Sequence, residues 1–354
     1  MSRAMPPKKP APRAARRALP ACLCAALLCS TILTAGARQK GGGPDRPARP
    51  DQQILDDGDV LRIDTDLVLV DVTVTDAEGR SVRGLRAEDF KLYEDGEQRP
   101  LAFVNVERRG GAERPVAVVL AVDVSGSMTV EEMAKLQSAL RDFSGHLSSR
   151  QALFSLMAFG RSARVLQPLT ADTRKLDRAV ERLAHEAEGL STHTYDAVDD
   201  AVRLLARQAP RTRGRELMKR AVVVVTDGFP VGDTVSASTV IERANAAGVS
   251  VYTVTLPSYS RLLASASTSR VPLPTPLDVS GLVEKTGGTN VYATERDYGP
   301  LFKALAEEVV STYVLAFYPP EEKRRDGRFH TIRVEAPRGL TVRQNRTGYK
   351  SGDK

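Results

Sequence analysis

The sequence predicts an α/β protein: a doubly wound, mostly parallel sheet that is inserted in, or flanked by, a small β-sandwich. Between residues 114 and 310, apolar runs of strand length alternate with amphipathic helical segments. The run at 222–225 (VVVV) has no polar alternation, which is typical of a central parallel strand covered by helices on both faces. On either side of this region, at 58–110 and 311–350, short strands separated by turns replace the alternation.

The N-terminal 37 residues have the pattern of an export signal. Arg16-Arg17 ends a basic stretch, an apolar run follows at 18–34, and Ala35-Gly36-Ala37 offers small residues for cleavage after Ala37. We therefore expect a signal peptide at 1–37 and a protein that is secreted or held in the periplasm or cell envelope, with no membrane insertion after cleavage. Retention of the apolar run as an anchor is the alternative, and the arginine pair leaves the Sec and twin-arginine routes open.

The composition of the remaining chain excludes several classes of protein. The formal charge of +7 comes from 51 Lys plus Arg residues against 44 Asp plus Glu, but six bases and no acid precede residue 38. The other 317 residues carry 45 bases against 44 acids and contain none of the three cysteines. A strongly basic nucleic-acid binder, a disulfide scaffold and a cysteine nucleophile are therefore not expected. A body of this size exceeds the usual single core, so two domains are expected.

The expected elements follow in chain order. Residues 38–57 are rich in Gly, Pro and charge and predict a flexible linker. Alternating apolar residues predict strands near 67–75, 90–94 and 101–107. The α/β domain at 114–310 is expected to contain strands at 116–122, 153–159, 164–168, 221–226, 249–256 and 289–292. Its helices are expected near 129–147, 173–186, 195–208, 236–247, 277–286 and 296–309.

Strand patterns return at 312–318, 328–336 and 339–343. Neither the N-terminal nor the C-terminal group of strands is large enough to bury a core alone, and the connections to the α/β domain are short. We therefore expect the two groups to form one sandwich that carries the α/β domain as an insertion. Two separate β pieces, each packed on the α/β domain, are the alternative.

Side chains with oxygen atoms follow two of the buried strands. Asp123 directly follows the first strand of the α/β domain and opens the sequence Asp-x-Ser-x-Ser, which includes Ser125 and Ser127. Asp227-Gly228 ends the strand at 221–226, and the segment STHTYD at 191–196 begins the helix between them. Each piece alone could be a helix cap or a turn. Because ligands of open parallel sheets bind beyond the carboxyl ends of the strands, their joint placement predicts a binding site.

This set of motifs resembles the metal-ion-dependent adhesion site of von Willebrand factor type A (VWA) domains. The flanking sequences LRAEDFKLYEDG (85–96) and VLAFYPP (314–320) are similar to the VWFA-related proteins that are abundant in acidobacteria. The resemblance implies hydroxyl ligands from two serines and a threonine and charge from two aspartates, acting partly through water. The implied metal residues are Asp123, Ser125, Ser127, Thr192 and Asp227. Thr194 is a rival of Thr192, although the spacing to Tyr195-Asp196-Ala197 favours Thr192.

Hydroxyl, carboxylate and water oxygens suit a hard cation, so Mg²⁺ is expected, with Ca²⁺ or Mn²⁺ as alternatives. Neutral hydroxyl ligands leave such an ion poorly neutralised, with a coordination position open to an Asp or Glu carboxylate of a protein partner. The resulting hypothesis is an extracytoplasmic, divalent-metal-dependent protein-binding module that acts in adhesion or envelope-complex assembly, with no nucleic-acid partner. The segment at 257–276, rich in Ser, Ala and Pro, is expected either to form part of the partner-binding rim or to be a disordered surface loop.

Two other functions are considered. The first is a structural envelope module whose metal only stabilises the fold. The second is a metal-dependent hydrolase, which needs a general base near the ion. His193 is the only histidine near the expected site, and its position favours a solvated loop residue. With no nucleophile-elbow or P-loop motif in the sequence, no catalytic residue and no enzyme activity are expected.

Overall fold

The computed structural model describes residues 67–105, 114–125, 128–186, 191–213, 216–256, 274–293 and 298–352. All of them belong to one compact unit, Gly58–Lys354. The expected signal peptide and linker, Ser127 and most of the segment at 257–276 lie outside the described residues. Among the described helices, none has the length and apolar character needed to cross a bilayer.

A six-stranded sheet forms the centre of the α/β domain, with the order β12-β11-β10-β5-β6-β7. All neighbouring pairs are parallel except β6 and the edge strand β7. In β5 and β10 nearly every residue is buried, because helices cover both faces. The strands are β5 (Val116–Asp123), β6 (Leu153–Phe159), β7 (Ala163–Thr170), β10 (Lys219–Thr226), β11 (Val249–Thr255) and β12 (Asn290–Tyr292). A short ribbon, β8 (Thr212–Arg213) with β9 (Glu216–Leu217), precedes β10.

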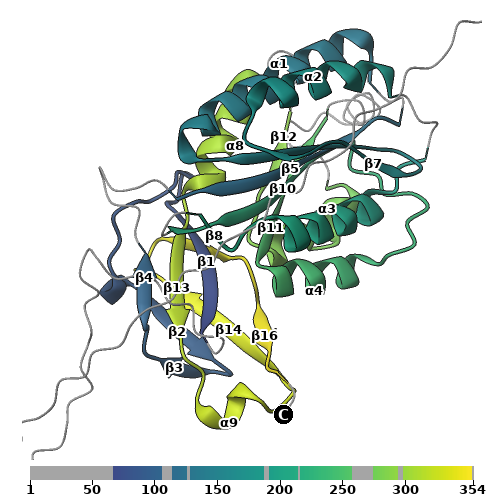
Figure 1. The fold of residues 1–354 in the computed structure, drawn as a ribbon. Helices are drawn as coiled ribbons and strands as arrows, with labels where there is room; N and C mark the ends of the chain where they lie inside the picture. Colours follow the sequence, from purple (N-terminus) through teal and green to yellow (C-terminus); the bar gives the residue numbers. More distant parts are fainter. Residues whose placement is uncertain are drawn as a thin grey trace, which may run out of the picture. The chain divides into compact units, whose positions relative to one another are not determined.

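Helices cover this sheet on both faces (Figure 1). One apolar core contains α1 (Val130–Leu147), α2 (Thr173–Arg182) and α8 (Gly299–Val310). The core on the opposite face contains α3 (Thr194–Gln208), α4 (Ala237–Ala247) and the short helices α6 (Pro276–Val279) and α7 (Leu282–Lys285). The doubly wound fold predicted from the sequence is thereby confirmed.

The prediction of one continuous helix at 277–286 is wrong, because this segment is divided into the two short helices α6 and α7. Gly281 separates the two pieces with a φ of 71°, a left-handed conformation that interrupts the helical path and that glycine adopts without a steric penalty. Helix α6 begins with a capping box, in which Thr275 and Asp278 exchange side-chain and backbone hydrogen bonds.

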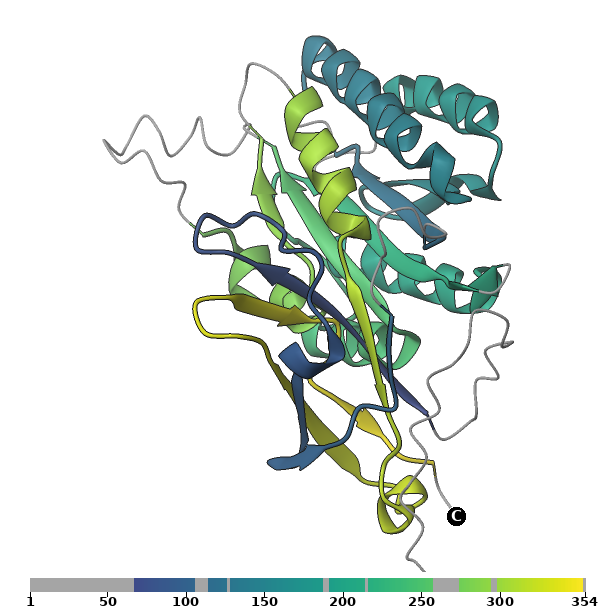
Figure 2. The same cartoon turned by 90° about the vertical axis from the view of Figure 1, so that its left-hand side faces the viewer.

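The remaining strands form two four-stranded antiparallel sheets, with the orders β15-β1-β13-β4 and β16-β14-β2-β3. Each sheet combines strands from both sides of the α/β domain, as Figure 2 shows for the purple β1 and the yellow C-terminal strands. The shared β-sandwich is therefore confirmed. Its N-terminal strands are β1 (Val68–Thr75), β2 (Lys91–Glu94), β3 (Glu97–Arg99) and β4 (Phe103–Asn105). Its C-terminal strands are β13 (Tyr313–Phe317), β14 (Phe329–Glu335), β15 (Thr341–Gln344) and β16 (Gly348–Lys350), with α9 (Glu321–Arg324) after β13.

Strand β1 is buried on both faces, contrary to what its polar alternation indicates. Val70, Val72 and Val74 face the core of the sandwich. The alternate residue Asp71 is also buried, and its carboxylate lies 3.0 Å from Arg114 and 3.4 Å from Lys219. Arg114 lies two residues before β5 and Lys219 begins β10, so this ion cluster joins the sandwich to the central sheet.

A second charged cluster lies within the sandwich. The ring of His330 is 5% exposed and lies between two carboxylates, with Nδ1 2.8 Å from Asp95 and Nε2 3.1 Å from Asp326. Lys323 also contacts Asp95, at 2.8 Å, and Tyr349 packs on the imidazole with ring centroids 5.3 Å apart. Burial opposes the charged imidazole, but the two carboxylates outweigh it and raise the pKa of His330 above its usual value.

The raised pKa predicts a pH-dependent stability. Because the folded protein holds the proton of His330 more tightly than the unfolded chain, this stabilisation is complete below about pH 6.5 and is lost as the pH rises through the raised pKa. We expect His330→Gln to lower the free energy of unfolding by about 1.5 kcal/mol at pH 6 and by less at pH 9. Urea unfolding across this range measures the effect, with the exposed His146→Gln as control. Parallel pH profiles for His330→Gln and the wild type would contradict the assignment.

Candidate metal-binding site

Asp123 and Asp227 lie at the point where the strand order reverses. From β5 the chain continues to β6 and β7 on one side, and it then returns to β10 and β11 on the other side. Asp123 is the last residue of β5, and Asp227 follows the end of β10 directly. The two strands are hydrogen-bonded neighbours in parallel register, with Val122 opposite Val225. Such a switch point is where open α/β sheets bind their ligands.

The carboxylate of Asp123 is 1% exposed and held at both oxygens. Oδ1 accepts the backbone N–H of Ser125 at 3.0 Å, and Oδ2 accepts the hydroxyl of Thr226 at 2.8 Å. The backbone N–H of Val124 donates to the carbonyl of Phe159 at 2.8 Å, which fixes the start of this loop against β6. The role of Thr226 as an orienting donor was not predicted from the sequence, although its place just before Asp227 puts it on the same sheet edge.

Both carboxylates lie in an environment that disfavours their charge. Burial is the main cause that raises the pKa of Asp123, and the negative charge of Asp227 adds to it, while hydrogen bonds from Ser125 and Thr226 oppose the shift. Burial likewise raises the pKa of Asp227, against a hydrogen bond from the N–H of Phe229. Among the described residues, no Lys, Arg or His forms an ion pair with either carboxylate. The pair therefore lacks a compensating cation in the part of the protein that the structure describes.

The loop that carries Thr192 lies between the end of β6 and the loop after β10. The N–H of His193 donates to the carbonyl of Gly160 at 2.9 Å, and the N–H of Val231 donates to the carbonyl of Thr192 at 2.8 Å. Thr192 is 5% exposed, as is Ser125. The structure thus places Asp123, Ser125, Thr192 and Asp227 on three loops at one edge of the sheet, and Ser127 lies outside the described residues.

Thr194 remains the rival of Thr192. It is the first residue of α3, it is fully buried, and its hydroxyl has no hydrogen-bond partner in the structure. Thr192, by contrast, is bonded through its carbonyl to the loop that begins at Asp227. The choice between the two hydroxyls stays a prediction.

Asp196, in the first turn of α3, holds the loop after β10 in place. Its carboxylate accepts the N–H groups of Thr234 at 3.0 Å and Val235 at 2.8 Å, and its own N–H donates to Asp233 at 2.9 Å. Burial disfavours the charge of Asp196, but these hydrogen bonds outweigh it and lower the pKa below its usual value. The sequence placed Asp196 in a motif but did not indicate this positioning role.

His193 is not the solvated loop residue that the sequence indicated. Its side chain is 20% exposed, and Nδ1 lies 3.3 Å from Asp196. A Cβ atom at Gly232 would lie 2.6 Å from Nε2, so the imidazole packs closely on the loop after β10. The histidine therefore supports the two loops.

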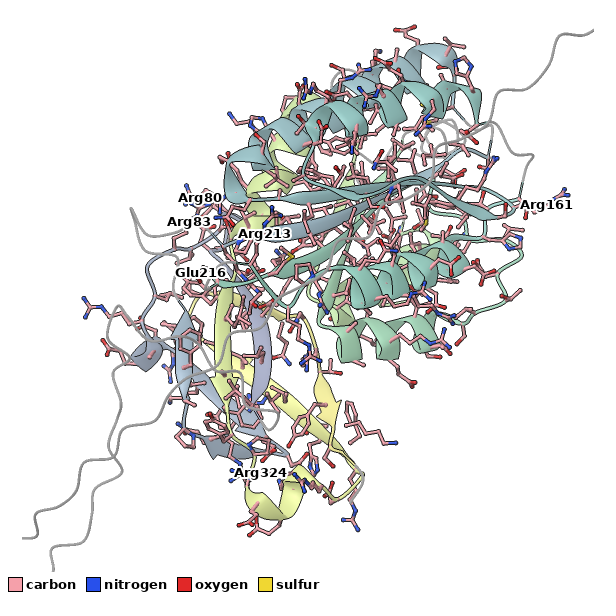
Figure 3. All side chains as sticks on the ribbon, in the orientation of Figure 1. Arg80, Arg83, Arg161, Arg213, Glu216 and Arg324 are labelled. Carbon is pink, nitrogen blue, oxygen red and sulfur yellow. The ribbon has the colours of Figure 1, made fainter. Side chains whose placement is uncertain are left out.

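Three of the large apolar side chains most exposed to solvent surround this edge of the sheet. Val130 at the start of α1 is 90% exposed, Val231 in the loop after Asp227 is 56% exposed, and Val279 of α6 is 77% exposed. Helix α6 contacts the same loop, because a Cβ atom at Gly228 would lie 2.7 Å from the side chain of Thr275. Arg161, in the turn between β6 and β7, projects away from the sheet beside this edge (Figure 3).

These features define a doubly wound α/β domain with an oxygen-rich site at its switch point. Residues 117–268 match the family model of the von Willebrand factor type A domain, and the six-stranded sheet with its helices has the VWA fold. VWA domains are generally non-catalytic protein-binding modules, and many of them bind a divalent metal.

Several solved structures are similar to this chain, at low sequence identity and low TM-score. An aerotolerance-related membrane protein of Bacteroides fragilis has 17% identity and a TM-score of 0.42, over 55% of this chain and 98% of its own. BatB of Bacteroides thetaiotaomicron has 19% identity and a TM-score of 0.39, over 55% and 97%. Proximal thread matrix protein 1 of the mussel byssus has 10% identity and a TM-score of 0.43, over 59% and 49%. No curated protein matches the sequence.

Proposed function

We propose that this protein is an extracytoplasmic, divalent-metal-dependent protein-binding module that acts in adhesion or in the assembly of an envelope complex. The observation that carries the proposal is the pair of carboxylates at the switch point, the buried Asp123 and the half-buried Asp227, which have no basic partner among the described residues. A bound cation would relieve the cost of burying both charges. The proposed ligand residues are Asp123, Ser125, Ser127, Thr192 and Asp227.

The donor set favours a hard ion. Carboxylate and hydroxyl oxygens suit Mg²⁺, with Ca²⁺ or Mn²⁺ as alternatives. When bound, the ion supplies a positive charge that can accept a carboxylate from a partner's Asp or Glu. The residues of this chain hold the ion at the rim of the sheet and, through Thr226 and Asp196, fix the loops that carry the ligands.

The surroundings of the site favour a protein as the partner. Exposed Val130, Val231 and Val279 offer apolar contact around the proposed ion, and protein interfaces combine such a patch with a few polar anchors. Arg161 adds a positive charge at the same edge, which suits an acidic partner residue. His193, the one histidine near the expected site and so the candidate general base, lies 3.3 Å from Asp196 and packs on Gly232, which disfavours the hydrolase alternative.

Two parts of this proposal rest on the sequence. The basic, apolar and small-residue order of residues 1–37 supports export by a cleaved signal. The motifs at 85–96 and 314–320 support a relationship with the VWFA-related proteins of acidobacteria. For this chain we propose a VWA domain at 114–310 between the two sandwich segments at 58–110 and 311–350.

A capture experiment tests the function. The mature chain is immobilised and exposed to cell-envelope extract in Mg²⁺ or in EDTA, beside an Asp123→Asn variant. We expect the wild type to retain an envelope protein in Mg²⁺ and to release it in EDTA, because the partner's carboxylate binds through the ion. We expect the variant to retain none. Mg²⁺ binding without any metal-dependent capture would instead support the structural module. Turnover of a substrate that EDTA removes and Mg²⁺ restores would support the hydrolase.

A further inference from the structure

A cavity lies at the opposite end of the central sheet from the proposed metal site. It has a volume of about 820 Å³ and is lined by parts of β1, α3 and α4, the residues before and at the start of β10, and the turn after β15. Asp227 follows the other end of β10, so the two sites are separated by the length of that strand. Six arginines line the cavity: Arg114, Arg203, Arg211, Arg220, Arg243 and Arg346.

The carboxylates near the cavity do not balance these arginines. Asp71, the one acidic residue in the lining, is engaged by Arg114 and by the buried Lys219. The single carboxylate of Asp199 contacts two arginines, Arg203 at 2.8 Å and Arg243 at 2.6 Å, so it balances only one of their two positive charges. Arg211, Arg220 and Arg346 have no carboxylate partner among the residues that the structure describes. The cavity therefore has an excess of positive charge.

Arg346 shows this imbalance most clearly. Its Nε is buried and has no hydrogen-bond partner, and a Cβ atom at Gly248 would lie 3.2 Å from its Nη2. The guanidinium is thus held against the C-terminal end of α4. Burial lowers the pKa of Arg346, with only the negative charge of Asp71 acting against it. A buried donor without an acceptor is costly, and a ligand that supplies the acceptor would remove that cost.

Arg220 lies beside the same helix end. Its Nη1 donates to the carbonyl of Ala247 at 3.2 Å and its Nη2 to the carbonyl of Ala209 at 2.7 Å. These carbonyls belong to the ends of α4 and α3 and fix the direction of the guanidinium. Because a helix end carries only about half an elementary charge, these ends do not replace a carboxylate as the partner of Arg220. Burial and the neighbouring Arg211 lower the pKa of Arg220.

We propose that this cavity is a binding site for an organic anion, whose carboxylate or phosphate group pairs with Arg346 and Arg220. The planar guanidinium matches both groups, because it presents two parallel N–H donors to two oxygens. The volume lies within the range of small-molecule sites. Leu67, Leu69 and Val202 also line the cavity, so the ligand carries an apolar portion beside its anionic group.

Calorimetric titration of the full chain tests the site with four probes: hexyl phosphate, hexanoate, inorganic phosphate and hexanol. We expect one of the two hexyl anions to bind at least tenfold more tightly than inorganic phosphate, which lacks the apolar chain. We expect hexanol, which lacks the anionic group, not to bind. The better of hexyl phosphate and hexanoate identifies the anionic group. Absence of binding by both hexyl anions at millimolar concentration would overturn the proposal.

Matched variants locate the binding. Arg346→Gln is expected to weaken the binding of the better hexyl anion at least tenfold. Arg346→Lys, which keeps the charge without the paired donors, is expected to weaken this binding less. Arg178→Gln, on the exposed side of α2 across the sheet, is expected to leave the affinity unchanged. Equal affinities of Arg346→Gln and Arg178→Gln would place the anion elsewhere and overturn the site.

A stability measurement separates this role from a purely structural one. Because Nε of Arg346 has no partner in the structure, Arg346→Gln without ligand should melt at the same temperature as the wild type or higher. The wild type should gain melting temperature in the better hexyl anion, and the variant should not. A variant that melts lower yet keeps the full ligand-induced gain would show that Arg346 only supports the fold.

Discussion

Replacement of Asp71 by Ala is expected to lower the free energy of unfolding by about 3–5 kcal/mol. The side chains of Asp71, Arg114 and Lys219 are 8%, 10% and 2% exposed, so the variant would leave two cations buried without their carboxylate. Burial of Asp71 raises the pKa of its carboxyl group. The charges of Arg114 and Lys219 outweigh this effect and hold the pKa below its usual value. Urea unfolding measures the loss.

Two further variants test the cause. Glu131→Ala removes a carboxylate that is 80% exposed and paired with Lys135, and it should cost less than about 1 kcal/mol. Adding Lys219→Met to Asp71→Ala should recover part of the loss, because one stranded charge disappears. A cost for Asp71→Ala as small as that for Glu131→Ala would show that the cluster does not join the sandwich to the sheet.

Asp123→Asn is expected to weaken Mg²⁺ binding about 100-fold, which corresponds to about 2.7 kcal/mol. The amide keeps the shape of the carboxylate and can still accept a hydrogen bond, but it removes one of the two charges that attract the ion. Without metal, the variant should unfold at nearly the same urea concentration as the wild type, because the charge of Asp123 is buried without a basic partner among the described residues. Calorimetric titration with Mg²⁺ and unfolding in EDTA measure the two effects.

The controls for this variant lie on the same domain. Asp142→Asn, an exposed position on α1, should leave the metal affinity unchanged. In the same titration, Thr192→Val should weaken Mg²⁺ binding and Thr194→Val should not, because Thr192 is the proposed ligand. Equal Mg²⁺ affinity in Asp123→Asn and the wild type would place the ion elsewhere or exclude it.

Local patterns were sufficient to predict much of the fold. The unbroken apolar run at 222–225 indicated a strand buried on both faces, and β10 is such a strand, because only a sheet with helices on each side can bury it. Asp123 and Asp227 could be assigned to one edge from sequence, since both follow parallel strands. Shorter elements, such as β3 and β16, were missed because three residues have too little pattern to identify a strand.

The sequence by itself determined that this chain forms a doubly wound sheet with strands on both sides of it, and which residues could reach the carboxyl edge. Only the tertiary structure decided what the polar residues of β1 contact, because Asp71, Arg114 and Lys219 are brought together by pairings between distant segments. It also decided that His193 packs on Gly232 and that the half-buried Arg346 has its Nε enclosed beside α4. A hydrophobic period specifies which face of an element is apolar, but the partner of each charge depends on which segments fold against one another.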